Sequence, residues 1–504
     1  MTSDCDADAD VFNQHHYEAT QEEVVRDVLR AGTDVDCGGF VTQYAPSALS
    51  KGVITQGDID TVLLRLFRLR IRLGHFDPVP SFLDKIGDDQ VCTAASVELA
   101  RDGARQSIVL AKNTGGLLPL ARASIKSVLV VGPNTNISDT INYYGSNPCF
   151  GTAGRWTPYD ALAQQLPGAV TSLLGVPDVG SHDTSGVAAA AAAAAAADLV
   201  VLAIGSDRSL ETEGKDRTSI AFSDGQLALI AAVAAAATRP VIALVLSGGA
   251  MDVSPLLANA KVGAVLIAGQ PSVQVVAAGD IIFGATLDGR PVAPAARMSQ
   301  MTYPTDYVNQ VSMFDFGMRP GPSAWPPGSN PGRTYRFYTG TPVLPFGFGL
   351  SYTTWTYTPL PDPHPPAAAL DLSAVRAAAE AHAEAGVVGH TPAALQAIAA
   401  DFWVNVTNTG AVDSDDVVLG FLTPPGAGSG GVPLQELFGF ERVFVPAGQT
   451  VTVYLGAQGV RFTQARAADG VRVALPGEYK VRFGVKETAA LGMGFAERTL
   501  RVAM

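Results

Sequence analysis

Four short apolar segments set the strongest constraint on how this chain can fold. Ala-rich segments separate them, including ten consecutive alanines at 188–197. Apolar strands without polar interruption are typical of a parallel sheet that is buried on both faces and connected by crossover helices. We therefore predict an α/β domain over residues 105–300, with the alanine run as a tightly packed crossover helix. The four segments are SVLVVGP (127–133), LVVLAIG (199–205), PVIALVLSG (240–248) and VGAVLIAG (262–269).

Residues 18–75 have the pattern of helix, turn and helix. Thr20 and Glu23 have the spacing of a capping box, directly before apolar residues at helical intervals. A second helix is expected to follow Thr55 and to end at Gly74, where a glycine cap fits. We expect its leucines to form one buried face. Its arginines are expected to be solvated or to face another domain, and they are Arg65, Arg68, Arg70 and Arg72.

The C-terminal part of the chain changes to a β pattern. Gly and Pro turns separate strand-like segments from Phe402 onward, which predicts an all-β sandwich over residues 401–504. Residues 301–360 are rich in Pro, Gly and aromatic residues and are interpreted as a connector. Residues 361–400, with PDPHPPAAALD and then an Ala- and His-bearing helix, are interpreted as an insertion.

Composition limits the partners of this chain. The formal net charge is −13 in 504 residues, which argues against a nucleic acid or an anionic membrane surface as partner, because both require clustered Lys and Arg. No apolar run is long enough for a spanning helix. The start MTSDCDADAD has neither the basic nor the apolar region of a signal peptide. A neutral or cationic small molecule fits the charge better.

The cysteines do not define a metal site. Their spacing lacks the CxxC pairs of a zinc site, so they are interpreted as ordinary thiols or as one or two bridges. The cysteines are Cys5, Cys37, Cys92 and Cys149.

A dense charged run follows the segment that ends at Gly205. Asp207 to Arg217 carry seven charged side chains in eleven residues, whereas 16% of the whole chain is charged. Ligands of open parallel sheets bind at the carboxyl ends of the strands, so this run is expected to face a cleft. We expect ion pairs to hold the loop and to leave one carboxyl group, Glu211 or Glu213, for chemistry. A solvated salt-bridged loop is the plain alternative.

A second acidic run opens the chain. TSDCDADADVFNQHHY contains four aspartates and two adjacent histidines. By itself this run fits a frayed acidic terminus or a weak metal-binding run as well as it fits catalysis. The residues are Asp4, Asp6, Asp8, Asp10, His15 and His16.

These runs and other motifs together resemble glycoside hydrolase family 3, in particular its β-xylosidase branch. The motifs occur in the family's order along nearly the whole chain, and include TSDCDADADVFNQHHY, GTDVDCGGF, SLETEGKDR, VLSGGAMDVSP, PGRTYRFYTG, PFGFGLSYT and LFGFERV. The resemblance implies a TIM-like barrel, an (α/β)6 sandwich with a mostly parallel sheet, and a fibronectin type III-like β-sandwich. The expected parts are a C-terminal remnant of the barrel (1–75), a linker and lead-in helix (76–104), the (α/β)6 domain (105–300), the connector (301–360), the insertion (361–400) and the fibronectin type III-like domain (401–504).

The resemblance also implies catalytic roles. The nucleophile of the family is the Asp of its SDC motif, here Asp4, and the general acid/base is a Glu of LETEGKDR. Glu213 is favoured for that role, with Glu211 as the alternative. A retaining glycosidase needs one ionised and one protonated carboxyl group about 5–5.5 Å apart. The reaction requires no metal and no organic cofactor, and the implied substrate is a xylo-oligosaccharide from which an exo-acting enzyme releases terminal β-linked xylose.

The resemblance begins at the nucleophile motif. The barrel strands that precede this motif in the family have no counterpart here, so the chain is expected to be a truncated form with little or no activity. The alternative is a non-catalytic carbohydrate-associated or interaction module made of the two C-terminal domains. The resemblance implies an extracellular or secretory location for the full-length parent. Cys5 and Cys37 lie in its motifs and are candidates for a bridge there, a pairing that the sequence alone leaves open. Asn136 and Asn405 lie in N-x-S/T sequons, which matter only in a secreted protein and are interpreted as chance occurrences.

Overall fold

The chain divides into two compact units, Met1–Val91 and Cys92–Met504, and each is described by itself. The computed structural model describes residues 1–80, 85–136, 156–212, 214–270, 275–361, 370–385, 393–465 and 470–503. No helix in these ranges combines the length and the apolar character that crossing a membrane requires.

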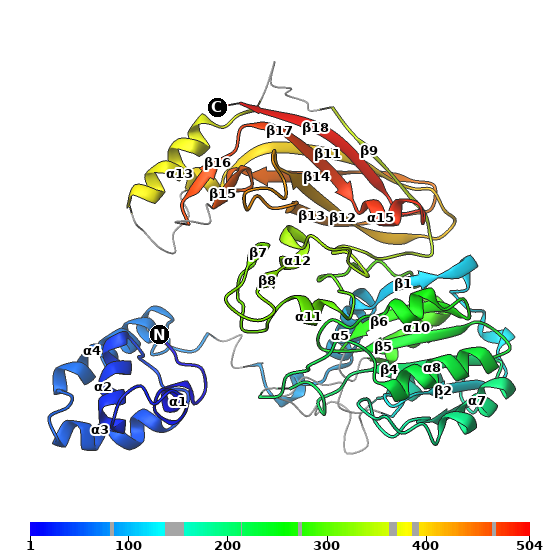
Figure 1. Ribbon diagram of the computed structural model, residues 1–504, viewed down its shortest axis with the longest axis horizontal. Helices are drawn as coiled ribbons and strands as arrows, with labels where there is room; N and C mark the ends of the chain where they lie inside the picture. Colours follow the sequence, from blue (N-terminus) through cyan, green and yellow to red (C-terminus); the bar gives the residue numbers. More distant parts are fainter. Residues whose placement is uncertain are drawn as a thin grey trace. The chain divides into compact units, whose positions relative to one another are not determined.

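The unit Met1–Val91 is built on four α-helices (Figure 1). Thr20 and Glu23 form the predicted capping box, and Thr55 forms a second one with Asp58. Gly74 has φ of 71° and follows Leu73, the C-cap residue of the fourth helix, which confirms the expected glycine at this end. The helices are α1 (Ala7–Asn13), α2 (Gln21–Ala31), α3 (Phe40–Ser50) and α4 (Gln56–Arg72).

The expectation that the leucines of α4 form a buried face is wrong for this structure. Val62 is the buried residue of α4, whereas Leu64 is 68% exposed and Leu69 is 56% exposed. The core of the unit lies on the other side, where Val62 meets residues of α2 and α3. A unit of this size has one small core, so the described residues of the unit do not bury the leucine side of α4.

The second unit contains a six-stranded sheet in the order β1-β6-β5-β4-β2-β3. Strands β2 to β6 run parallel to their neighbours, and β1 is antiparallel to β6 at one edge. Every residue of β2, β4 and β5 is buried, which confirms the prediction of a parallel sheet covered on both faces. The strands are β1 (Val109–Asn113), β2 (Val128–Val131), β3 (Val170–Leu173), β4 (Leu199–Gly205), β5 (Val241–Leu246) and β6 (Val262–Gly269).

Helices cover this sheet. The alanine run forms α7, which contacts α8 and in which Ala190 and Ala194 are buried; this confirms the predicted crossover helix (Figure 1). Alanine side chains permit this close packing of helix on helix. The helices are α5 (Ala94–Ser107), α6 (Pro158–Ala163), α7 (Val187–Ala196), α8 (Asp224–Ala236), α9 (Ser254–Ala258) and α10 (Ala277–Phe283).

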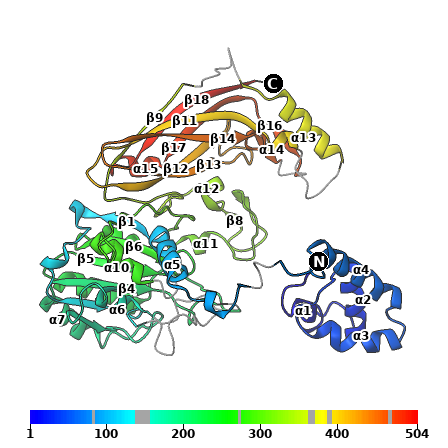
Figure 2. The same cartoon turned by 180° about the vertical axis from the view of Figure 1, so that it is seen from behind.

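A connector with little regular structure follows. It contains α11 (Tyr307–Gln310), the short strands β7 (Gly321–Pro322) and β8 (Ser329–Asn330), and α12 (Thr334–Phe337). It lies between the α/β domain and the β-sandwich (Figures 1 and 2). Tyr303, Tyr307 and Tyr338 form a ring cluster with centroid distances of 4.0–5.4 Å, which stabilises the connector.

The last part of the chain is the predicted β-sandwich. One sheet has the order β10-β18-β17-β12-β13 and the other the order β14-β11-β9. A single hydrophobic core runs through the α/β domain and the sandwich, and contains Leu244 and Phe402 alike. The strands are β9 (Trp355–Pro359), β10 (Leu370–Asp371), β11 (Ile398–Asn408), β12 (Ser414–Thr423), β13 (Glu436–Val445), β14 (Thr450–Gln458), β15 (Thr463–Ala465), β16 (Arg472–Ala474), β17 (Gly477–Gly484) and β18 (Phe495–Ala503). The helices of this part are α13 (Ser373–Ala385), α14 (Ala393–Gln396) and α15 (Lys486–Ala489).

Candidate functional site

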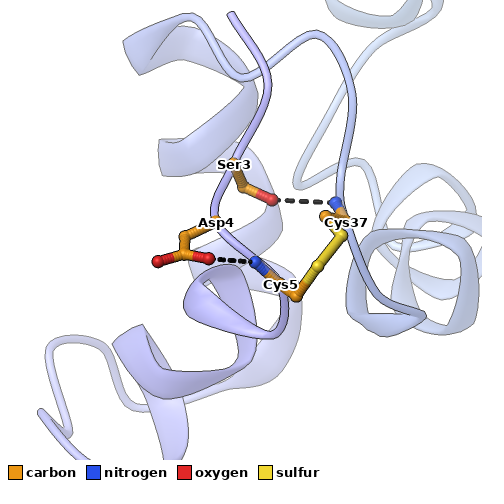
Figure 3. Close-up of a disulfide and its surroundings, with 4 residues drawn as sticks. All are labelled: Ser3, Asp4, Cys5 and Cys37. Atoms are coloured by element: carbon orange, nitrogen blue, oxygen red, sulfur yellow. Dashed lines mark hydrogen bonds between the residues drawn. A yellow bond between two sulfur atoms is a disulfide. The ribbon is translucent and has the colours of Figure 1, made fainter. Parts of the chain in front are cut away.

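Asp4 lies in the segment that leads into α1. Its side chain is exposed, and its Oδ1 accepts a hydrogen bond from the backbone N–H of Cys5 at 2.7 Å (Figure 3). Its backbone carbonyl accepts from the N–H of Ala7 at 3.2 Å, at the start of the helix. The carboxylate is thus held at one oxygen and open to solvent.

The segment around Asp4 is fixed on both sides. Cys5 and Cys37 form a disulfide with a Cα–Cα distance of 4.3 Å, a pairing that the sequence left open (Figure 3). The N–H of Cys37 donates to Ser3 Oγ at 2.8 Å, and the N–H of Ser3 donates to the carbonyl of Val35 at 2.9 Å. The interpretation of this run as a frayed terminus is therefore wrong, because these contacts join it to the 35–37 segment.

The acidic run also contains a buried carboxyl group. Asp8 is 5% exposed on α1, and its Oδ2 has no hydrogen-bond partner among the described residues. Burial raises the pKa of Asp8, and the nearby carboxylate of Asp36 raises it further. Within the part of the chain that the structure describes, no group of three or more His, Cys, Asp or Glu side chains has the arrangement of a metal site.

Glu211 lies in the loop after β4, where the charged run begins. Its Oε1 accepts from the N–H of Gly248 at 2.7 Å and from the hydroxyl of Ser206. Its Oε2 lies 2.7 Å from Nε of Arg217, and Arg217 also donates to the carbonyl of Ala250 at 3.0 Å. Glu211 thus ties the loop after β4 to the loop after β5, which confirms that ion pairing holds the charged run.

A tight turn follows Glu211. Thr212 and Lys215 pair backbone to backbone, with N···O distances of 3.1 and 2.9 Å. Gly214 has φ of 72°, a conformation that favours glycine. Glu213, the next residue after Thr212 in the sequence, lies outside the described residues.

A hollow of about 520 Å³ adjoins this loop at the carboxyl end of β4. Gln226 forms one wall and fixes the end of the strand, because its side chain bonds both the N–H of Gly205 (2.9 Å) and its carbonyl (3.0 Å). A Cβ at Gly205 would lie 1.8 Å from the carbonyl oxygen of Leu246, so only glycine fits there. Lys215 and Arg217 also line the hollow. The position agrees with the expectation of a cleft at this end of the sheet.

The candidate nucleophile Asp4 and the alternative acid/base Glu211 belong to different units. Asp4 lies in Met1–Val91 and Glu211 in Cys92–Met504. The sequence did not point to Ser206 or Gly248 as partners of Glu211. Arg217 was part of the recognised charged run, although its pairing with Glu211 was not specified.

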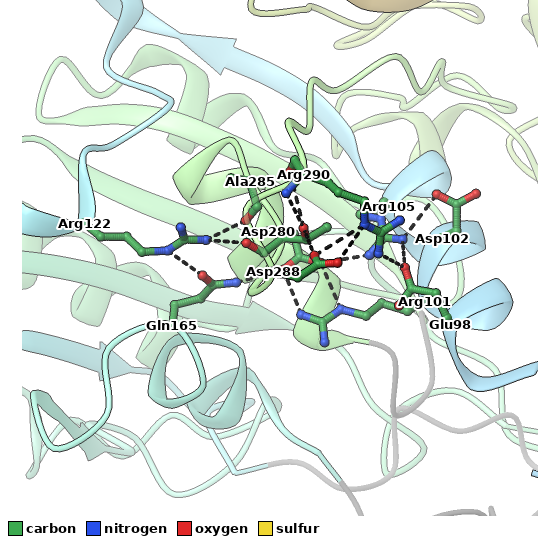
Figure 4. Close-up of polar contacts among 11 residues, drawn as sticks. Glu98, Arg101, Asp102, Arg105, Arg122, Gln165, Asp280, Ala285, Asp288 and Arg290 are labelled. Carbon is green, nitrogen blue, oxygen red and sulfur yellow. Dashed lines mark hydrogen bonds and ion pairs between the residues drawn. The ribbon is translucent and has the colours of Figure 1, made fainter. Parts of the chain in front are cut away.

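A polar network that sequence reasoning missed holds α5 on the α/β domain (Figure 4). Asp280 on α10 is fully buried and accepts two hydrogen bonds from Arg101, at 2.9 and 2.7 Å. Arg105 and Gln165 donate to the same carboxylate at 3.0 and 2.8 Å. The i, i+4 spacing of the two arginines was the available signal, since it places both on one helix face.

Two protein-family models match parts of the chain. Residues 108–352 match the model described as the glycosyl hydrolase family 3 C-terminal domain. Residues 416–486 match the model of the fibronectin type III-like domain.

Curated relatives extend the similarity beyond these two domains. Beta-D-xylosidase 1 of Arabidopsis thaliana is 35% identical over 492 residues, which are 96% of this chain and 61% of the relative. A probable exo-1,4-beta-xylosidase of Aspergillus oryzae is 35% identical over an alignment 508 positions long, gaps included, which covers 99% of this chain and 59% of the relative. The chain therefore spans about three fifths of the length of the curated relatives it matches.

Solved structures agree with the observed fold. A family 3 exo-beta-xylosidase in complex with a xylobiose aziridine activity-based probe superimposes with a TM-score of 0.82 at 29% identity, covering 100% of this chain and 61% of that one. A beta-glucosidase from Listeria innocua in complex with isofagomine gives a TM-score of 0.74 at 21% identity, covering 99% and 63%, and supports the fold alone.

Proposed function

The chain belongs to glycoside hydrolase family 3, and from this membership we propose that it forms part of a retaining exo-glycosidase that releases terminal β-linked xylose from xylo-oligosaccharides. The observation that carries the proposal is similarity along 96–99% of the chain to relatives whose names are β-xylosidases. A neutral sugar substrate also agrees with a chain of net charge −13.

In the proposed mechanism, Asp4 is the nucleophile. An ionised carboxylate attacks the anomeric carbon and forms a glycosyl-enzyme, which water then hydrolyses. The contacts of Asp4 support this role: the Cys5 N–H orients one oxygen, and the side chain stays exposed. The Cys5–Cys37 bridge restricts the backbone beside it. A nucleophile held in one orientation approaches its target at a lower entropic cost.

Glu213 is the proposed general acid/base. Such a group must reach the glycosidic oxygen and exchange a proton with it. Both oxygens of Glu211 are already engaged, by Ser206 and Gly248 on one side and by Arg217 on the other. These contacts disfavour Glu211 as the acid/base. They fit a positioning role instead, in which Glu211 holds the loop whose sequence contains Glu213.

The test is hydrolysis of p-nitrophenyl β-D-xyloside by this chain and by the longest polypeptide that its gene encodes. Asp4→Ala should abolish hydrolysis, and azide should restore turnover with an inverted glycosyl azide as product. Asp10→Ala, in the same acidic run, is the matched control and should retain activity. Full activity of Asp4→Ala contradicts the proposed nucleophile.

The acid/base assignment has its own test. Glu213→Ala should lower the rate most for substrates with poor leaving groups, and azide should restore turnover with retention of configuration. Glu211→Ala should not respond to azide in this way. The reverse pattern would assign the acid/base role to Glu211.

We also propose that the protein acts in the secretory pathway or outside the cell. The Cys5–Cys37 disulfide supports this location, because disulfides persist mainly in oxidising compartments.

A non-catalytic carbohydrate-associated module is the second candidate. It is favoured by the continuous core that the α/β domain and the sandwich share without any residue of Met1–Val91. Binding of xylo-oligosaccharides without hydrolysis, in this chain and in the longest polypeptide of its gene, would select this candidate.

A further inference from the structure

One outer face of the β-sandwich carries a row of residues that the proposed hydrolase does not use. On β11, Phe402, Val404 and Val406 are at most 1% exposed and point into the core. Successive side chains of a strand alternate between its two faces. Trp403 and Asn405 therefore share the opposite, outer face with Thr407, and all three are partly exposed.

The neighbouring strands complete this face. Trp403 lies opposite Tyr454 of β14, with ring centroids 5.3 Å apart, and Tyr454 is 47% exposed. Asn405 lies opposite Thr452 of β14 and Thr358 of β9, both exposed. Two aromatic rings thus adjoin a partly exposed patch of small polar side chains that contains Asn405.

The amide of Asn405 is oriented by its neighbour. The hydroxyl of Thr452 donates to Asn405 Oδ1 at 2.7 Å. With its oxygen engaged on the β14 side, the amide directs Nδ2 away from Thr452. An Asn side chain carries its acceptor and its donor on opposite branches of one planar group.

The sequence at this position is Asn405-Val406-Thr407, an N-x-T acceptor without proline. An aromatic residue two positions before the Asn lies on the same face, because two residues of an extended strand advance about 7 Å without changing face. The first sugar of a glycan on Asn405 can therefore place its C–H face on the Trp403 ring. The interpretation of this sequon as a chance occurrence does not explain why Asn405 and Trp403 lie on the same face.

We propose that Asn405 carries an N-linked glycan whose first sugars pack on the Trp403–Tyr454 ring pair. A bond forms between Nδ2 and C1 of an oligosaccharide, and the bond from C1 to a lipid-linked diphosphate breaks. The diphosphate leaves with the electron pair of that bond, and the amide loses one proton. The proposal rests on the proposed secretory location and not on the hydrolase activity.

The first test uses cell-free translation of the full chain, behind an added signal sequence, with endoplasmic-reticulum microsomes. We expect a mass increase that peptide N-glycosidase removes, and loss of one glycan in both Asn405→Gln and Thr407→Ala. Asn136→Gln is the matched control, because it removes the other sequon and should retain the glycan on Asn405.

An unchanged glycan count in Asn405→Gln overturns the proposal. The microsomes supply the secretory compartment, and the readout does not depend on hydrolysis of any sugar substrate. A negative result therefore counts against the glycan site and leaves the proposed glycosidase untouched.

The second test concerns packing of the glycan on the rings. Glycosylated chain secreted from a eukaryotic host is compared before and after enzymatic removal of the glycan. We expect removal to lower the Tm of the unit Cys92–Met504, which contains the sandwich, by about 2–4 °C. The same removal should have no effect in Trp403→Ala, whereas Thr356→Ala on the same face should behave like the parent. An equal decrease in Tm on glycan removal in Trp403→Ala and in the parent overturns the packing part of the proposal.

Discussion

Arg217 and Glu211 form an ion pair across the base of the charged loop, with Nε 2.7 Å from Oε2 and both side chains largely buried, at 14% and 16% exposure. The pair joins the segment after β4 to the segment after β5, because Glu211 also accepts from Gly248 and Arg217 donates to Ala250. The Thr212–Lys215 backbone pairing therefore lies between two residues that are held by this ion pair.

Glu211→Gln should loosen this loop without unfolding the domain. The change removes a charge-assisted contact worth about 1.5–3 kcal/mol. Hydrogen exchange at 206–217 should become faster, while exchange in β4 and β5 stays slow. Asp216→Asn, an exposed change in the same loop, should leave exchange unaltered. Equal exchange in Glu211→Gln and the parent would contradict the positioning role.

Asp8 should make the unit Met1–Val91 less stable as the pH rises. Its pKa in the folded chain lies above the ordinary value of 3.8, through burial and then through Asp36, so folding favours its protonated form. Stability from this group is complete below about pH 3.8 and decreases as the pH passes through the raised pKa. Hydrogen exchange of α1 and α2 as a function of pH measures the effect.

Asp8→Asn should remove this decrease and protect α1 and α2 more than the parent does at neutral pH. Asp10→Asn, an exposed change on the same helix, should keep the pH dependence of the parent. A parent whose exchange protection rises between pH 4 and 7 would contradict the assigned sign.

Asp280 should be essential for the stability of the second unit. Asp280→Asn removes the charge that two arginines share in a buried site, and leaving such charges unpaired costs about 3–5 kcal/mol. Denaturant unfolding of the full chain should show this loss in the transition of the unit Cys92–Met504. Asp288→Asn, which removes a solvent-exposed pair with Arg290, should change stability by at most about 1 kcal/mol. Equal effects of the two changes would contradict the account of the network.

The central strands could be predicted because both of their faces are buried. β2, β4, β5 and β6 lie inside the four apolar segments. β1 and β3 lie at the edges of the sheet, where only one neighbour is present and polar residues are tolerated. The sequence VTSL of β3 alternates in burial and is too short for a clear pattern. Edge strands are the elements that apolar runs fail to mark.

The candidate site could be predicted only in part. Asp4 was assigned from motif resemblance, whereas the Cys5–Cys37 pairing stayed open, since spacing alone does not define a disulfide partner. The engagement of Glu211 depends on Gly248 and Arg217, which approach it only when the loops after β4 and β5 lie side by side. The exposure of the α4 leucines could not be predicted, because helical periodicity indicates an apolar face and not what covers it.

The most direct measurement of the central claim is peptide mapping after incubation with a 2-deoxy-2-fluoro-β-xyloside that traps the glycosyl-enzyme. If Asp4 is the nucleophile, the longest polypeptide of the gene should gain the mass of one fluoroxylosyl group, carried on Asp4. Asp4→Asn should gain no label, and Asp10→Asn should be labelled like the parent. A label on any other carboxylate, or undiminished labelling of Asp4→Asn, would contradict the assignment of Asp4 as the nucleophile of a retaining xylosidase.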